Sequence, residues 1–272
     1  MLSKLLRLFS RNISKPTVVT FTGGMGAQVI SAAIYFSLRN KGRKVYADLS
    51  YFDRTENVAK VGNAGQVSHW SWQLEPFGLT LASFETASGL ASHQMELIED
   101  GPKKLELGLK GLREAEVQGH FVIKGGVEGI LPAEFLPGYL CVHVRRGDYV
   151  NVGSTLVSDD KFVELASKLA VFAKNLVVVS DSSIKAGFRQ QIAAGYERAV
   201  FLDDIDAFTT HRVMRGARIL ICSNSQFSLI AALLNSQALV FFPKRWFVPG
   251  QQAIEQLIHE SCEFQILDSI GE

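Results

Sequence analysis

LCVHVRRGDYV, residues 140–150, joins a run of apolar residues to a group of charged ones. The apolar run predicts a buried strand, because strands covered on both faces are nearly continuous in apolar residues. Arg145 and Arg146 follow where this strand ends, with Gly147 and Asp148 after them. Side chains alternate along a strand, so we expect the two guanidinium groups to lie on opposite sides and to have different roles.

Strands and helices alternate on both sides of this stretch. Upstream, residues 17–21, 27–42 and 44–49 predict a strand, a helix and a second strand, which together form a βαβ unit. Downstream, four further apolar runs separated by amphipathic stretches predict four more strands: NLVVVS, RAVFLD, RILICS and ALVFFP. This alternation predicts an α/β fold with mainly parallel sheets.

The best boundary between domains is the dipeptide Pro137-Gly138. It separates an N-terminal lobe at 16–137 from a C-terminal lobe at 138–272, and a basic amphipathic segment at 1–15 precedes the first lobe. In the N-terminal lobe HFVIKGG, residues 120–126, is expected to be a strand. Residues 51 to about 90 show no periodicity that assigns them to a helix or a strand.

The composition excludes several classes of protein. The 272 residues are 47% hydrophobic and carry a formal net charge of +1, without the basic excess that is typical of nucleic-acid-binding proteins. The three cysteines have no CxxC spacing and the six histidines no HxxxH pair. We therefore expect free thiols in a reducing cytoplasm, no dedicated zinc site and no nucleic-acid partner.

The first fifteen residues carry Lys4, Arg7, Arg11 and Lys15 and no acid. Three of these lie at helical spacing, with apolar residues on another face, as in a helix that lies on an anionic membrane surface. The alternative is an ordinary N-terminal helix that frays or packs on the core. The apolar run is too short for a signal peptide or a membrane span, so we expect a cytoplasmic protein, peripheral at the inner face of the membrane under the first interpretation.

Polar residues gather where the predicted strands end, at 23–28, 143–148, 180–181, 203–206 and 223–228. Ligands of open α/β sheets bind outside the carboxyl ends of the strands, so we expect these groups to form one site. The last group has four polar side chains where a helix begins, more than helix capping requires, and helix N-termini attract anions. The sequence therefore predicts a site for a polar, phosphorylated ligand.

The two arginines suit such a ligand. One guanidinium is expected to bind two oxygens of a diphosphate, and the other to pair with Asp148 or another buried acid. A purely structural salt-bridge corner is the alternative. A second alternative is an NAD(P)-dependent oxidoreductase, because the glycine turn before the first helix is close to G-x-G-x-x-G, but Val29 occupies the third glycine position after Gly24 and Gly26.

Taken together, four blocks resemble the α-1,2-fucosyltransferases: GGMGAQ, HVRRGDYV, VVVSD, and RILICSNSQFSLIAALL with ALVFFPKRWF. They occur in the same order between about Phe21 and Phe247. The resemblance implies a GT-B-like fold of two Rossmann-like lobes, with GDP-fucose bound mainly by the second lobe. It implies inverting transfer of fucose to a hydroxyl, usually O2 of galactose in a surface glycan or oligosaccharide, with neither a metal nor another cofactor.

The resemblance also implies roles for particular residues. His143 and Arg145 would contact the donor, Arg145 at its β-phosphate, and Asp148 is the candidate catalytic base, although a phosphate oxygen could accept the proton instead. The remaining residues expected to bind the donor are Gly24, Gly26, Asp181, Asp206, Ser225, Phe227 and Ser228.

The sequence departs from the family's pattern in three ways. Ala27 stands where the family has Asn, and Leu229 and Ile230 stand where it has paired aromatic residues. The acid that reads guanine in related fucosyltransferases falls near Thr210, with Asp206 one helical turn earlier as a substitute. Because Ala27 removes a polar side chain, a non-catalytic protein that binds sugar nucleotides or glycans is the alternative from another functional class.

Overall fold

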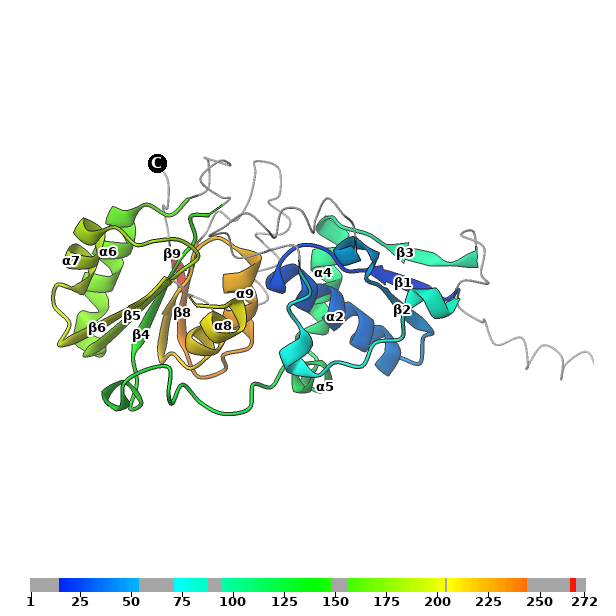
Figure 1. Cartoon of the computed structure of the whole chain (residues 1–272), viewed down its shortest axis with the longest axis horizontal. Coiled ribbons are helices and arrows are strands. Elements are labelled where there is room, and N and C mark those ends of the chain that lie inside the picture. Colours follow the sequence, from blue (N-terminus) through cyan, green and yellow to red (C-terminus); the bar gives the residue numbers. More distant parts are fainter. Residues whose placement is uncertain are drawn as a thin grey trace, which may run out of the picture.

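The computed structural model describes residues 15–53, 71–87, 94–147, 156–203, 205–243 and 265–267. They form two lobes, each built on a parallel sheet (Figure 1). The N-terminal lobe has a three-stranded sheet of order β2-β1-β3, and the C-terminal lobe has a six-stranded sheet of order β6-β5-β4-β7-β8-β9. The predicted α/β class with parallel sheets is confirmed, as is its GT-B-like division into two lobes.

The N-terminal lobe contains the predicted βαβ unit. Strand β1 (Thr17–Thr20), helix α2 (Met25–Asn40) and strand β2 (Val45–Asp48) follow one another, and β1 pairs in parallel with β2. On its other edge β1 pairs with β3 (Glu96–Ile98), a strand that the sequence pattern did not predict. The other helices in the described part of this lobe are η1 (Ser50–Asp53), η2 (Glu75–Phe77), η3 (Phe84–Ala87), α4 (Pro102–Gly111) and α5 (Ala115–Gly119).

The stretch that joins the two sheets contains one more short helix, η5 (Ala133–Phe135). The predicted strand at 120–126 is wrong, since these residues form turns and irregular backbone. Of the apolar residues in this run, only Phe121 is completely buried, while Val122 is exposed. The run has the composition of a strand but pairs with no described strand of either sheet.

The C-terminal lobe alternates strands and helices along its whole described length. Its elements are β4 (Leu140–Val144), α6 (Asp159–Leu169), η7 (Ala170–Phe172), β5 (Asn175–Ser180), α7 (Ala186–Ala193), β6 (Arg198–Leu202), α8 (Ala207–Arg215), β7 (Ile219–Ile221), α9 (Gln226–Leu233), β8 (Leu239–Pro243) and β9 (Gln265–Leu267). Ser158 caps α6, because its hydroxyl accepts a hydrogen bond from the N–H of Lys161. The strand order reverses between β4 and β7, which makes this the topological switch point of the sheet.

The two faces of the large sheet have different partners. Leu140, Val142 and Val144 pack with residues of α6 and α7 in one apolar cluster. Cys141 faces the other way, into a cluster that includes α8, α9 and also α2 of the N-terminal lobe. The apolar core is therefore continuous from one lobe to the other.

Gly26 allows this close packing of the lobes. A Cβ on Gly26 would lie 2.6 Å from the backbone nitrogen of Phe227 and 2.7 Å from the carbonyl carbon of Gln226. The first turns of α2 and α9 thus meet backbone to backbone, near the centre of Figure 1. At this position the glycine is required by packing between helices.

Two predictions lie outside the described residues. Residues 1–14, which carry most of the basic amphipathic segment, and Asp148 are not described, so the membrane-surface helix and the candidate base stay predictions. In the described part of the chain, no helix is both long enough and apolar enough to cross a membrane.

Candidate active site

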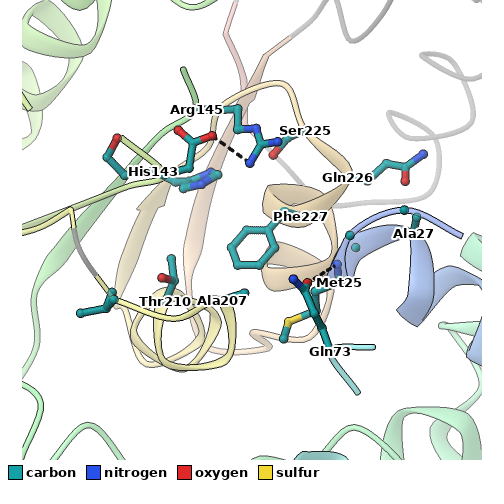
Figure 2. A pocket seen from close by; sticks show the side chains of 16 residues that line it. Met25, Ala27, Gln73, His143, Arg145, Ala207, Thr210, Ser225, Gln226 and Phe227 are labelled. Carbon is teal, nitrogen blue, oxygen red and sulfur yellow. Dashed lines mark hydrogen bonds and ion pairs between the residues drawn. The ribbon is translucent and has the colours of Figure 1, made fainter. Parts of the chain in front are cut away.

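A pocket with a volume of about 270 Å³ lies between the two lobes, at the carboxyl ends of β4, β5 and β7 (Figure 2). This is the switch point at which ligands bind in open α/β sheets. The N-terminal lobe contributes the turn at 23–27 together with Gln73. The C-terminal lobe contributes His143, Arg145, Ser180, Asp181, Ile205, Ala207, Thr210, Ser225, Gln226 and Phe227.

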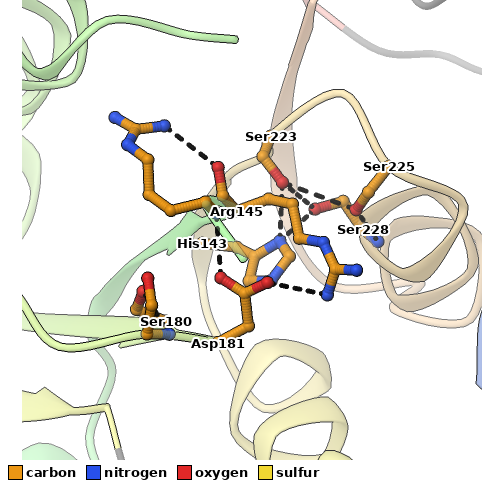
Figure 3. A network of polar contacts seen from close by, with 9 residues as sticks. His143, Arg145, Ser180, Asp181, Ser223, Ser225 and Ser228 are labelled. Atoms are coloured by element: carbon orange, nitrogen blue, oxygen red, sulfur yellow. Dashed lines mark hydrogen bonds and ion pairs between the residues drawn. The ribbon is translucent and has the colours of Figure 1, made fainter. Parts of the chain in front are cut away.

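Arg145 is held in this pocket by Asp181 (Figure 3). Its Nη1 lies 2.9 Å from Oδ2 of Asp181, and each of the two side chains is only 11% exposed. The other oxygen of Asp181 accepts a hydrogen bond of 2.8 Å from the N–H of Arg146. A Cβ on Gly147 would overlap Oδ2 of Asp181, so glycine is needed for the carboxylate to reach the turn. Asp181 therefore lines the pocket and also holds the Arg145–Gly147 turn in place.

Arg146 points to the opposite side of β4, as the alternation of side chains predicted. Its Nη2 lies 2.5 Å from Oδ1 of Asp159 at the start of α6, and its guanidinium carbon lies 5.8 Å from the ring centre of Phe162. This partner is not a buried acid, since the side chain of Asp159 is 42% exposed, and the pairing with Asp148 stays a prediction because Asp148 lies outside the described residues. Arg146 ties the end of β4 to α6, and Arg145 alone of the two lines the pocket.

His143 is a buried, uncharged wall of the pocket. Its Nδ1 is hydrogen-bonded to the hydroxyls of Ser223 and Ser228, and the hydroxyl of Ser223 lies 3.4 Å from that of Ser225 (Figure 3). Burial, with the positive charge of Arg145 as a second cause, lowers the pKa of His143 to about 3. The imidazole is therefore neutral at physiological pH and fixed in orientation by serine hydroxyls.

Phe227 presents its ring to the pocket, as Figure 2 shows. Its ring centre lies 5.4 Å from that of His143 and 5.2 Å from that of His211. His211 is completely buried behind it, and within the described residues neither of its ring nitrogens has a hydrogen-bond partner. Burial, with the charge of Arg215 as a second cause, lowers the pKa of His211 well below its usual value. Phe227 thus packs between two neutral imidazoles.

The N-terminal wall is organised by two glutamines. Oε1 of Gln73 accepts a hydrogen bond of 2.7 Å from the N–H of Met25, at the start of α2. Buried Gln28 donates to the carbonyls of Gly23 and Ser71, each at 2.8 Å, and its Oε1 accepts from the N–H of Gln73 at 2.8 Å. Gln28 therefore joins the glycine turn to the segment that carries Gln73 into the pocket.

Sequence comparison matches one part of the chain to a family. Residues 114–246, from the end of the N-terminal lobe to just beyond β8, match the model of "Glycosyl transferase family 11". This part of the chain is a family 11 glycosyltransferase domain. It includes every pocket residue that the C-terminal lobe provides, whereas the glycine turn and Gln73 lie outside the match. Comparison with curated proteins finds no match.

Comparison with solved structures finds matches at low identity. Heptosyltransferase WaaC from E. coli, with ADP, is 12% identical and covers 91% of this chain and 100% of its own, with a TM-score of 0.47. POFUT1 in complex with GDP is 12% identical, covers 82% and 96%, and has a TM-score of 0.43. Fucosyltransferase NodZ from Bradyrhizobium is 10% identical, covers 84% and 95%, and has a TM-score of 0.39. Values of this size carry no inference about substrates.

Most residues predicted for donor binding do line the pocket of the family 11 domain. Figure 2 shows His143, Arg145, Ser225 and Phe227 around it, and Asp181, Gly24 and Gly26 also belong to its wall. Ser225 is in addition the cap of α9, since its hydroxyl accepts a hydrogen bond from the N–H of Ser228 at 3.1 Å.

Two of the predicted residues lie elsewhere. Ser228 is completely buried behind His143 and does not line the pocket, so its hydroxyl supports the imidazole. Asp206 caps α8, where its carboxylate accepts hydrogen bonds from the N–H and the hydroxyl of Thr209 at 2.9 and 2.6 Å. Ile205 and Ala207 on either side face the pocket, so the expected substitution of Asp206 for the guanine-reading acid is wrong in the described arrangement.

The other departures from the family's pattern have different consequences. Ala27 and Thr210 both line the pocket, so the loss of a polar group at the first position and of an acid at the second changes its surface. Leu229 and Ile230 are completely buried in the core cluster shared by the two lobes. This exchange of aromatic for aliphatic residues affects packing between the lobes and leaves the lining of the pocket unchanged.

Proposed function

We propose that this glycosyltransferase moves fucose from GDP-fucose, with inversion, to O2 of a galactose in a surface glycan or oligosaccharide. The observation that carries the proposal is Arg145, held by Asp181 in the pocket between the lobes, within a family 11 domain. A guanidinium that is preorganised and largely shielded from water stabilises negative charge more strongly than one in solvent. Such charge develops on the diphosphate when GDP leaves.

The start of α9 would complement Arg145. Ser225, Gln226 and Phe227 form the N-terminal turn of this helix and all line the pocket. The N–H groups of a first helical turn favour anions, so a diphosphate between Arg145 and α9 would be met from both sides. Within the described residues no group of three or more histidine, cysteine or acidic side chains could hold a metal ion, and we propose that transfer needs none.

The residues of the site divide the remaining work. His143 would contact the donor as a neutral hydrogen-bonding group, since its pKa of about 3 excludes a charged form at physiological pH. Asp181 is engaged through both oxygens and would position Arg145. Asp148 stays the proposed acceptor of the proton from the sugar hydroxyl, with a phosphate oxygen as the alternative.

Nucleotide binding tests the donor. GDP should bind more tightly than UDP by isothermal titration calorimetry, in buffer with or without EDTA. Arg145→Gln should weaken GDP at least tenfold, whereas Arg146→Gln, which changes a charge on the opposite side of the strand, should leave GDP affinity unchanged. Equal affinity for the two nucleotides, or a strict requirement for a divalent ion, would contradict the proposal.

Transfer itself distinguishes the enzyme from a protein that only binds. Incubation with GDP-fucose and a β-galactoside should release GDP and give a fucosylated product with an α-1,2 linkage, as identified by NMR. Donor binding without any turnover, on a panel of galactosides, would instead support the non-catalytic interpretation that Ala27 motivates.

We also propose peripheral contact with anionic membranes through residues 1–15, whose four basic residues have no acidic neighbour within the segment. Co-sedimentation with vesicles should require anionic lipid, weaken with salt and disappear when these residues are deleted. Equal sedimentation of the truncated chain would exclude the segment as the anchor.

A further inference from the structure

A second cavity, of about 200 Å³, lies beneath the stretch that joins the two lobes. One wall is formed by residues of that stretch: Ile123, Gly125, Gly126 and Val127. The other walls are the last turn of α8, with Arg212 and Arg215, and the turn between α9 and β8, with Asn235, Ser236 and Gln237. We name it the junction cavity. It shares no lining residue with the pocket between the lobes.

The two arginines of the junction cavity have no acidic partner among the described residues, unlike several other arginines of the chain. Within the described residues, no carboxylate forms an ion pair with Arg212 or Arg215, whereas Arg145, Arg146 and Arg189 each have one. Glu128 is close to the backbone of Gly126 but pairs with neither arginine. Positive charge in the last turn of a helix is favoured by the helix dipole, which accounts for the residue type.

The helix dipole does not account for how the guanidinium groups are placed. Nε of Arg212 is buried and has no hydrogen-bond partner within the described residues. A buried N–H without a partner leaves the charge of its guanidinium less well solvated. Arg215 uses Nη1 to bind the carbonyl of Phe121 at 2.6 Å, and burial lowers its pKa to about 10. Both groups are therefore partly dehydrated cations.

The backbone around Arg212 is also shaped to admit its guanidinium. Gly125 has a φ of 86°, and a Cβ there would lie 2.8 Å from Nη2 of Arg212. An ordinary side chain would be strained at this φ and would displace the arginine. The result is that Arg212 and Arg215 both line a hollow whose other lining residues are glycines, the polar residues 235–237 and the apolar Ile123, Val127 and Leu234.

We propose that the junction cavity binds a phosphate group through Arg212 and Arg215. Two guanidinium charges match a phosphate, which carries about −1.5 to −2 at neutral pH, better than a singly charged carboxylate. The group can belong to inorganic phosphate or to a sugar phosphate. Once bound, it links the junction at 123–127 to α8, whose first turn lines the pocket between the lobes through Ala207 and Thr210.

Calorimetric titration of the whole chain with Arg145→Gln tests this proposal, because that substitution removes the arginine of the other phosphate-binding candidate. This protein should bind one equivalent of inorganic phosphate at constant ionic strength, and acetate much more weakly. At one hundred times the Kd, phosphate should raise Tm by roughly 5 °C. Galactose 1-phosphate in place of phosphate distinguishes the two sources: tighter binding identifies a sugar phosphate, and exclusion identifies the free anion.

Variants then locate the bound phosphate. Adding Arg212→Gln should weaken it at least tenfold, whereas Arg218→Gln, a change of the same charge outside the cavity, should not. Ser236→Glu keeps both arginines and places a carboxylate in the cavity, so it should abolish binding while the protein stays folded, and Ser236→Gln should not. No phosphate binding in the Arg145→Gln protein, meaning that the cavity takes water only, would overturn the proposal. Unchanged binding with Ser236→Glu would overturn it as well. Neither result bears on the proposed donor site, which is tested separately by GDP binding to the wild type.

Discussion

Substitution of Gly26 by Ala is expected to force the lobes apart, and its cost can be worked out from the structure. The new Cβ would lie 2.6 Å from the backbone nitrogen of Phe227, against an ordinary contact of about 3.4 Å, so a shift of about 0.8 Å is needed. The atoms it meets are backbone, and no rotamer change can relieve the overlap. Overpacking of this kind costs about 1–3 kcal/mol, while Ala in place of Gly in a helix returns about 0.5–1 kcal/mol. The cost of the overlap should exceed the gain in helix propensity, so the variant should be less stable than the wild type.

Gly187 provides the matched control. It is also the second residue of a helix, α7, but a Cβ there meets no atom within 4 Å. Gly187→Ala should therefore raise Tm by about 1–3 °C and Gly26→Ala should lower it by several degrees, since 1 kcal/mol corresponds to about 2–4 °C for a chain of this size. Differential scanning calorimetry measures both. If Gly26→Ala were as stable as Gly187→Ala, the backbone contact between α2 and α9 would not exist as described.

Three further predictions concern the pocket. Folding lowers the pKa of His143 and of His211 below the usual 6.5, so the unfolded chain binds more protons than the folded chain in acid. Each histidine should therefore reduce the free energy of unfolding by about 1.4 kcal/mol per pH unit below pH 6.5. A urea midpoint that stays constant from pH 7 to pH 5 would refute this. Gln28→Leu leaves three partly buried backbone groups without their partner and should lower the free energy of unfolding in urea titrations by about 2–4 kcal/mol. A loss below about 0.5 kcal/mol, which is the size of a surface substitution, would mean that these hydrogen bonds are dispensable. Ala27→Asn should raise kcat for fucose transfer about tenfold or more with GDP affinity unchanged, and no gain would show that the site works with alanine at this position.

The strands β4 to β8 of the C-terminal lobe, like the βαβ unit of the N-terminal lobe, could be predicted from the sequence. These strands are continuous apolar runs bounded by polar clusters, and β4 and β5 are buried along their whole length, which is what such runs indicate. Alternation along β4 also placed Arg145 and Arg146 on opposite sides correctly. The strand at 96–98 was missed because three residues, one of them the exposed Leu97, are too few for a period to show.

Site residues were predicted where a sequence motif lies at the end of a strand. They were missed where they depend on partners that are distant in the sequence. His143 lies near the end of β4, Arg145 follows that strand directly, and Phe227 lies at the start of the helix after β7, so their place in the pocket was visible in the sequence. Gln73 reaches the pocket only because Gln28 holds its segment through hydrogen bonds across 45 residues, and no local pattern signals that. Ser228 and Asp206 were misplaced because a hydroxyl or carboxylate near a helix start can face a ligand or satisfy the protein itself, and the linear order of residues does not distinguish the two.

The continuous core limits how a nucleotide can enter and leave. In many two-lobed enzymes a hinge motion swings the lobes wide apart between turnovers. Here such a motion would have to break the backbone contact between Gly26 and residues 226–227 and bring buried apolar side chains of the core cluster shared by the lobes into contact with water. Full exposure of two such side chains costs about 3–6 kcal/mol, which would make a wide-open state rare. Packing between the lobes thus sets the width of the cleft. Donor exchange has to proceed through small movements at its rim while the two lobes stay packed against each other.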